Sequence, residues 1–441
     1  MNRRFAPAGH KFRLSRQAAQ LSFIPQGHKF RLSRQAAQLS FIWIRLSIAA
    51  ILLTLGRPGI ALETYIGGFG TASLSCFSSD TADYVINDQP EGPGRTRHCD
   101  AGLDSTLGVQ LDLGLSESVD FGLQIVAGRN VERNFKPDVT LAQLRWRPTD
   151  ALTLRLGRMP SSAFLHAENR QVRYAMPWVR PPLEVYGLVP AFSQDGLEII
   201  NEGSFGRWQT EWHGGITRIA FDVAASNSRE TFPIEANGAF LNLTLRDRNT
   251  QIKLGYGYSK TSFTSADAEA LFGALSALVF PDGAQLADDL AIDQAATHLF
   301  GLGMSHEQND WLAMAEFGFR SIEGFFRDQY GAYVTLGKRF GPWMPYSTLA
   351  WRWTRGPDSD SRAGFLQPQV DVVLASSRYD TSSLALGLSR EITEQATLKF
   401  QADWIQPDKN SWGLYYNHAP DYDYANPDSD WLFTLSLDFI F

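Results

Sequence analysis

The chain has 441 residues, of which 44% are hydrophobic, 12% aromatic and 20% charged, so its composition is not that of a disordered protein. Residues 1–61 hold ten Lys and Arg and no acidic residue, which leaves a net charge of −17 on the remainder; such an acidic body argues against a nucleic-acid partner, because phosphate binding needs a basic face. The longest strongly apolar run, residues 46–55, is half as long as the roughly 20 residues of a membrane-spanning helix, which excludes a helical membrane protein.

The basic head of the chain predicts an export signal that is later removed. A basic flank ending at Arg45 precedes the apolar run, and the small residues Gly59 and Ala61 occupy the positions that signal peptidase inspects. We therefore expect cleavage after Ala61. The alternative for the apolar run is a buried core helix.

The same head contains a perfect repeat, since the sequence of residues 9–24 recurs at residues 27–42. The repeat is too short for a solenoid, which needs several stacked units. We interpret it as a duplication or as translated upstream DNA, and a tandem binding motif is the alternative. The expected organisation is a removed extension over residues 1–61 and a mature domain over residues 62–441.

From residue 63 onward, apolar and polar residues alternate. In the segment 106–115, for example, Leu107 and Val109 lie on one side of an extended chain, and Gln110 and Asp112 lie on the other. A period of two is typical of strands with one apolar and one polar face. A soluble sandwich and a transmembrane barrel both produce this pattern.

Three further features favour the barrel. The candidate strands run to ten residues or more, as tilted membrane strands do, whereas soluble strands average about five or six. Tryptophans gather at strand ends, where a membrane interface would hold them. Tight turns alternate with long polar loops, like the periplasmic turns and external loops of outer-membrane barrels. We expect an all-β, transmembrane antiparallel β-barrel of about 16 strands, over residues 64–77, 99–115, 119–129, 138–148, 151–159, 194–201, 206–216, 238–246, 249–260, 294–306, 310–321, 326–340, 343–356, 378–391, 395–406 and 430–441.

The last strand carries a resemblance to a known family. It ends in WLFTLSLDFIF at residues 431–441, with Phe439 and Phe441 on its apolar side. This resembles the C-terminal strand of Gram-negative outer-membrane proteins, and the mature chain as a whole is similar in architecture to general diffusion porins. The resemblance implies a location in the outer membrane, recognition of Phe439 and Phe441 by the barrel assembly machinery, and possible assembly into homotrimers.

Cys76 and Cys99 flank the first long loop, at the end of one candidate strand and the start of the next. Adjacent antiparallel strands bring such positions together, and exported chains meet an oxidising compartment. We predict a Cys76–Cys99 disulfide that contributes roughly 3 kcal/mol through loop entropy. Two reduced cysteines are the alternative, and no metal site is expected, because no further ligands cluster near them.

The loop 160–193 follows the fifth strand and contains YAMPWVRPPLEVYG at residues 174–187. This block resembles a stretch of porin-like outer-membrane proteins, and general diffusion porins carry an inward-folding loop at this place. The resemblance implies that the loop narrows the channel. Its prolines restrict its freedom, and Trp178 and Tyr186 are expected to anchor it by packing.

Charged residues near this loop are candidates for the channel wall. Arg145, Arg147 and Arg155 share the inward side of their strands, and we expect them to face Glu168 and Glu184 of the loop. Opposed rings of charge bias ion selectivity. Arg170, Arg173 and Arg180 of the loop are further candidates. The alternative is that the strand arginines pair with inward-facing acids, namely Asp112, Asp120 and Glu198.

Motifs of catalysis are missing from the sequence. It has no G-x-S-x-G nucleophile motif, no H-E-x-x-H motif and no paired-cysteine motif, and its eight histidines are scattered. We therefore expect no enzyme activity, no cofactor and no metal. The expected function is an outer-membrane porin for passive diffusion of small hydrophilic solutes or ions. The alternatives are a barrel-anchored adhesin or structural protein, and an outer-membrane enzyme.

Overall fold

A computed structural model describes residues 63–86, 89–224, 230–277 and 282–441. The predicted export signal and its repeat lie outside these residues. Residues 62–441 form a compact unit of their own, and the description below concerns this unit. None of the helices in the described residues is both long enough and apolar enough to span a bilayer.

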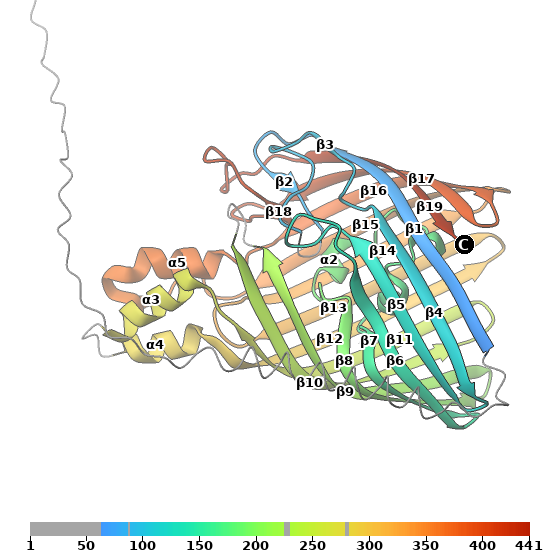
Figure 1. Ribbon diagram of the computed structural model, residues 1–441. Coiled ribbons are helices and arrows are strands. Elements are labelled where there is room, and N and C mark those ends of the chain that lie inside the picture. Colours follow the sequence, from blue (N-terminus) through green and yellow to red (C-terminus); the bar gives the residue numbers. More distant parts are fainter. Residues whose placement is uncertain (1–62, 87–88, 225–229, 278–281) are drawn as a thin grey trace, which may run out of the picture. The chain divides into compact units, whose positions relative to one another are not determined.

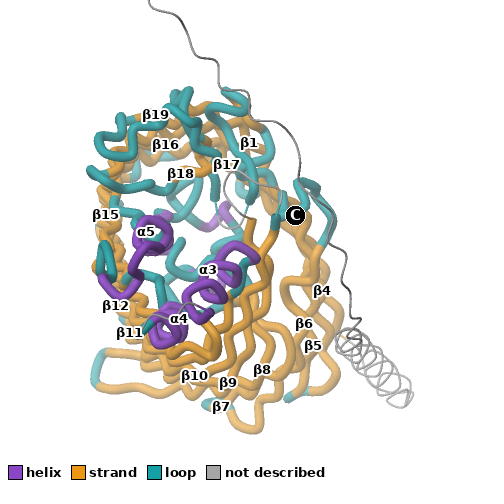
Figure 2. The backbone as a smooth tube through the Cα atoms, turned by 90° about the vertical axis from the view of Figure 1, so that its left-hand side faces the viewer, coloured by secondary structure: helices purple, strands orange, loops and turns teal. Residues whose placement is uncertain are grey.

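The unit is a closed antiparallel barrel of 16 strands, which confirms the expected fold class (Figures 1 and 2). Each long strand pairs with its neighbours in the chain. The barrel strands are β1 (Glu63–Phe77), β4 (Thr106–Ser116), β5 (Val119–Gly128), β6 (Asp138–Thr149), β7 (Leu152–Pro160), β8 (Ser193–Phe205), β9 (Trp208–Ala224), β10 (Thr231–Arg246), β11 (Thr250–Phe263), β12 (Ile292–Gln308), β13 (Trp311–Ile322), β14 (Asp328–Lys338), β15 (Trp343–Arg355), β16 (Thr381–Thr393), β17 (Ala396–Pro407) and β19 (Asp430–Ile440).

The first and last strands close the barrel. Residues Phe69 to Phe77 of β1 pair with β19, while the earlier part of β1 pairs with β4. Phe441 continues the seam, because its backbone N–H donates to the Gly68 carbonyl and its own carbonyl accepts from the Gly68 N–H. Closure removes every open sheet edge, whose unpaired backbone groups would each cost several kcal/mol in hydrocarbon.

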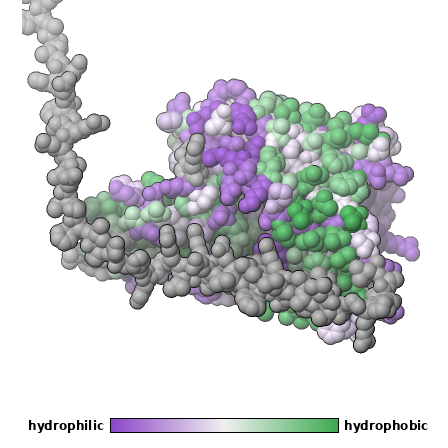
Figure 3. All heavy atoms as spheres, in the orientation of Figure 1, coloured by the Kyte–Doolittle hydropathy of each residue, from purple (hydrophilic) through white to green (hydrophobic). Residues whose placement is uncertain are grey.

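The barrel is apolar outside and polar inside. In β19, Leu435 is 49% exposed on the outer surface, whereas Thr434 and Ser436 are each 1% exposed on the inner side. Figure 3 shows a hydrophobic band on the outer wall over β1 and β4, bordered by hydrophilic residues. This is the surface that a barrel needs where lipid surrounds it.

Short turns lie at one end of the barrel and long connections at the other, as the sequence predicts. The long connections carry the short strands β2 (Asp83–Tyr84), β3 (Cys99–Asp100) and β18 (Tyr415–Tyr416), and the helices α3 (Ala266–Ala277), α4 (Gly283–Leu290), η3 (Ser361–Leu366) and α5 (Gln367–Ala375). The helices α3, α4 and α5 lie together at the mouth of the barrel (Figure 2). The predicted disulfide joins Cys76 and Cys99 within this end of the barrel.

The hairpin of β9 and β10 is taller than expected. The sequence predicts strands over 206–216 and 238–246, but β9 runs to Ala224 and β10 begins at Thr231. In this extension the polarity is reversed, since Arg218 and Glu235 form an exposed ion pair of 3.0 Å while Ile219 and Phe221 line an inner cavity. The prediction places apolar residues on the outer face. It therefore ends both strands before this extension, where the apolar residues lie inside.

Candidate channel interior

The loop between β7 and β8, residues 161–192, packs against the inner wall of the barrel. The Trp178 side chain is 1% exposed, and its Nε1 donates to Thr335 Oγ1 on β14 at 3.0 Å and to Thr348 Oγ1 on β15 at 3.1 Å. The Tyr186 hydroxyl donates to Glu316 Oε1 on β13 at 2.6 Å. The two aromatic residues named from the sequence therefore contact the same side of the barrel. The loop itself contains three short helical turns: η1 (Ala167–Asn169), η2 (Arg173–Ala175) and α2 (Leu183–Tyr186).

A lysine that the sequence analysis did not single out also holds the loop. Lys399 of β17 is completely buried, and its Nζ donates to the carbonyls of Arg173 and Met176 at 2.7 Å and of Trp178 at 3.0 Å. Its Nζ also lies 2.9 Å from Asp438 Oδ2 on β19. Lysine has three N–H donors and no acceptor, so its three donors serve the three loop carbonyls, while its charge balances that of the Asp438 carboxylate.

Arg173 and Arg180 are tied to the wall rather than presented to solvent. Arg180 donates to Asp104 Oδ2 at 2.6 Å and to Asp403 Oδ2 at 3.2 Å, and Arg173 lies 2.8 Å from Asp104 Oδ1. Burial alone would raise the pKa of Asp104, but the charges of Arg180 and Arg173 hold it below its usual value. Asp104 therefore stays ionised and joins the first long connection to the inner loop.

Glu184 does not face the strand arginines, contrary to the expectation. Its side chain is buried against β16, where Oε1 accepts from Ser383 Oγ at 2.5 Å. The reason is local, because α2 directs Glu184 toward the wall on which the loop lies. Burial raises the pKa of this carboxyl.

The strand arginines do not form an open basic ladder, and the alternative stated for them is the observed one. Arg145 binds Asp120 and lies 3.1 Å from Asp112, and Arg147 lies 2.6 Å from Asp120. The cross-strand register explains this, because Arg145 of β6 stands opposite Asp120 of β5. Paired charges of opposite sign largely cancel at a distance.

Of the three strand arginines named from the sequence, Arg155 also contacts the loop. Its Nε donates to Glu198 Oε2 at 2.8 Å, and its Nη1 lies 3.5 Å from Glu168 Oε2. His213 Nδ1 lies 3.5 Å from Glu168 Oε1. Burial would raise the pKa of Glu168, but His213 and Arg155 lower it to about 2, so this carboxyl is ionised at neutral pH.

A large cavity lies between the inner loop and the mouth. Its volume is about 740 Å³, and residues of β9, β10, β11 and β12 form much of its wall. Loop residues 187–191 border it on the inner side. The described residues contain no group of three or more His, Cys, Asp or Glu side chains that could hold a metal ion.

Comparisons with known proteins show similarity in fold but no match in sequence. No protein-family model and no curated protein matches the sequence. Many solved structures resemble the barrel, among them two that are each 10% identical in sequence. An anion-selective porin from Comamonas acidovorans has a TM-score of 0.51, with coverage of 86% of this chain and 100% of that chain. The outer membrane channel DcaP of Acinetobacter baumannii has a TM-score of 0.53, with coverage of 86% of this chain and 97% of that chain. The chain thus has the fold of an outer-membrane porin-type barrel.

Proposed function

We propose that this protein is an outer-membrane porin, a channel for passive diffusion of small hydrophilic solutes and ions. The observation that carries the proposal is that the closed barrel is apolar outside and polar inside, the reverse of a soluble protein. Lipid-facing Leu435 and its counterparts cover the outside, while the interior holds charged groups that water reaches, such as the Glu168 side chain, which is 37% exposed beside Arg155. Charged side chains are costly to place inside a barrel unless water reaches it, so this interior fits a hydrated passage.

The inner loop gives such a channel its constriction in this proposal. Trp178, Tyr186 and Lys399 hold the loop on the side of β13–β17. The passage would then run along the opposite side, past Arg155 and the solvent-accessible Glu168. Since Arg145, Arg147, Arg173 and Arg180 are already paired, we expect them to stabilise the wall and contribute little to ion selectivity.

The proposal includes no catalytic role and no cofactor. We expect the barrel assembly machinery to insert the chain, with Phe439 and Phe441 in the recognised strand, and we expect homotrimers. Crosslinking of the purified protein in detergent tests the trimer, because a trimeric channel would give a product of three chains and a monomeric one would not.

Planar-bilayer recording of the purified, refolded protein tests the channel itself. We expect stepwise increases of current in potassium chloride, and no steps from the same protein left unfolded in urea. Folding is verified separately by the slower migration of an unheated sample in gel electrophoresis. A folded sample that inserts and gives no conductance would overturn the proposed function.

A further inference from the structure

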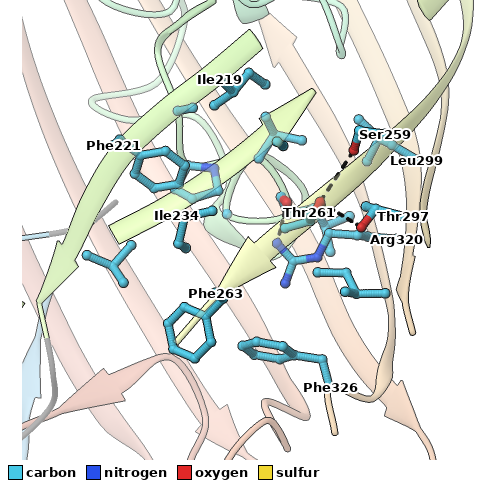
Figure 4. A pocket seen from close by; sticks show the side chains of 18 of the residues that line it. Ile219, Phe221, Ile234, Ser259, Thr261, Phe263, Thr297, Leu299, Arg320 and Phe326 are labelled. Atoms are coloured by element: carbon cyan, nitrogen blue, oxygen red, sulfur yellow. Dashed lines mark hydrogen bonds between the residues drawn. The ribbon is translucent and has the colours of Figure 1, made fainter. Parts of the chain in front are cut away.

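The cavity below the mouth is apolar over its outer part, which a passage for hydrophilic solutes alone would not need. Phe221 of β9, Ile234 of β10 and Phe263 of β11 point into it, together with Phe326 from the connection of β13 and β14 (Figure 4). Phe325 and Phe326 stack with ring centroids 4.8 Å apart. An apolar cavity of several hundred cubic ångströms with few polar groups is typical of a binding site for a small organic ligand.

Two arginines lie at the inner part of the same cavity. Arg320 of β13 and Arg352 of β15 both line it. Arg320 stands opposite Leu299, which stands opposite Gly257, and this places Arg320 nearer the turn end of the barrel than Phe263. A solute that enters from the mouth therefore meets the aromatic wall first and the two cations afterwards.

Neither arginine lies within ion-pair distance of a carboxylate among the described residues, although the charge of Glu184 acts on Arg352 from farther away. Arg320 donates to the Leu188 carbonyl at 2.8 Å and to Gln329 Oε1 at 2.6 Å, and Arg352 donates to the same Gln329 oxygen. Arg352 Nε and Gln329 Nε2 are buried without a hydrogen-bond partner. The Glu184 carboxylate accepts its hydrogen bond from Ser383 and forms no hydrogen bond or close ion pair with either arginine.

This pair differs from the other arginines of the interior. Arg145, Arg155 and Arg180 each contact one or two carboxylates, whereas Arg320 and Arg352 share a single neutral amide oxygen. Two guanidinium groups that share a neutral acceptor repel each other, and without a carboxylate at contact distance their lost hydration is compensated only in part. A carboxylate matches the fork of N–H donors on arginine and would supply that compensation.

We propose that this cavity is a selectivity site for organic monocarboxylates with an apolar body. The carboxylate would bind Arg320 and Arg352, and an aromatic or alkyl body would lie against Phe221, Phe263 and Phe326. The Tyr379 ring, whose centroid is 5.7 Å from Arg352 Cζ, borders the same place. The inference rests on the proposed function, because the cavity lies on the passage between the mouth and the inner loop.

Current blockade in planar bilayers tests the site with three probes, which separate the contribution of the carboxylate from that of the apolar body. We expect 3-phenylpropionate to interrupt the potassium chloride current of the wild-type channel at concentrations at least tenfold below those of acetate, which lacks the body. The alcohol 3-phenylpropanol lacks the charge and should also be at least tenfold weaker. Equal blockade by the alcohol would overturn the role of the arginines, and equal blockade by acetate would overturn the role of the apolar wall.

Single substitutions test whether the blockade occurs at the two arginines. Arg320→Gln and Arg352→Gln should each weaken blockade by 3-phenylpropionate at least tenfold and keep the chloride conductance. The matched control Arg218→Gln, on the outer face of β9 and outside the cavity lining, should leave blockade unchanged. Conductance without any blockade in the wild type would overturn the site and leave the channel standing. A folded wild type without conductance would overturn the channel. The comparison of the three probes on the wild type needs no variant to fold.

Discussion

Replacing Lys399 by Met should release the inner loop from the wall. The substitution retains a long apolar stem and removes the ammonium that binds the Arg173, Met176 and Trp178 carbonyls. It also leaves the buried carboxylate of Asp438 without its cation. Removing one partner of a buried ion pair typically costs about 3–5 kcal/mol. The contacts of Trp178 and Tyr186 remain, so we expect a loosened loop in an intact barrel.

Hydrogen exchange of the loop amides measures the effect. Since about 1.4 kcal/mol corresponds to a factor of ten, a cost of about 3–5 kcal/mol should speed exchange of loop residues 173–180 by about two to four orders of magnitude. The amides of β19 away from Asp438 should keep their protection. In bilayers, the same variant should show a noisier open-channel current, because the loop borders the passage.

A double variant separates the charge from the hydrogen bonds. Lys399→Met with Asp438→Asn removes the uncompensated carboxylate, so loop protection should recover in part, while the three unpaired carbonyls keep it below the wild-type level. Loop exchange in Lys399→Met within a factor of two of the wild type would refute the reasoning. It would mean that packing of the aromatic residues alone holds the loop.

Three further outcomes follow from contacts at other places. Replacing Cys76 and Cys99 by Ser should lower the free energy of unfolding by roughly 3 kcal/mol, measured by denaturant titration, because their disulfide spans a sequence separation of 23; a wild type treated with reductant should behave alike. Burial lowers the pKa of His166 to about 4 from an ordinary 6.5, so protonation favours the unfolded chain. The free energy of unfolding should therefore be about 2 kcal/mol lower at pH 5 than above pH 6.5. A decrease of the same size in His166→Gln would contradict this. Arg147→Gln alone should shift the reversal potential toward cations, whereas adding Asp120→Asn should restore it, because the pair is neutral as a unit; an equal shift in both would indicate a free basic wall.

The strand pattern was predictable because lipid outside and polar groups inside force opposite polarity on successive residues. The pattern fails in the upper part of β9 and β10, where Ile219 and Phe221 face a cavity and Arg218 faces outward. Beyond the membrane the outer surface no longer needs apolar residues, so the rule that apolar residues face outward does not apply to this part of the strands.

The interior was less predictable, because alternation gives the side on which a residue lies and not its partner. Arg145 and Asp120 were both placed inside, but only the register of β5 and β6 sets them opposite each other. Lys399 also has the inward position in its strand. Whether such a lysine meets water or a loop depends on where a segment more than 200 residues earlier folds, and no local pattern reports that.

The seam between β1 and β19 has a consequence for synthesis and export. Its hydrogen bonds join β1 to β19 and reach to Phe441. A product that terminates before β19 lacks one side of the seam, so β1 and β17 are left with unpaired edges. The barrel can therefore close only after β19 has been synthesised and delivered to the membrane.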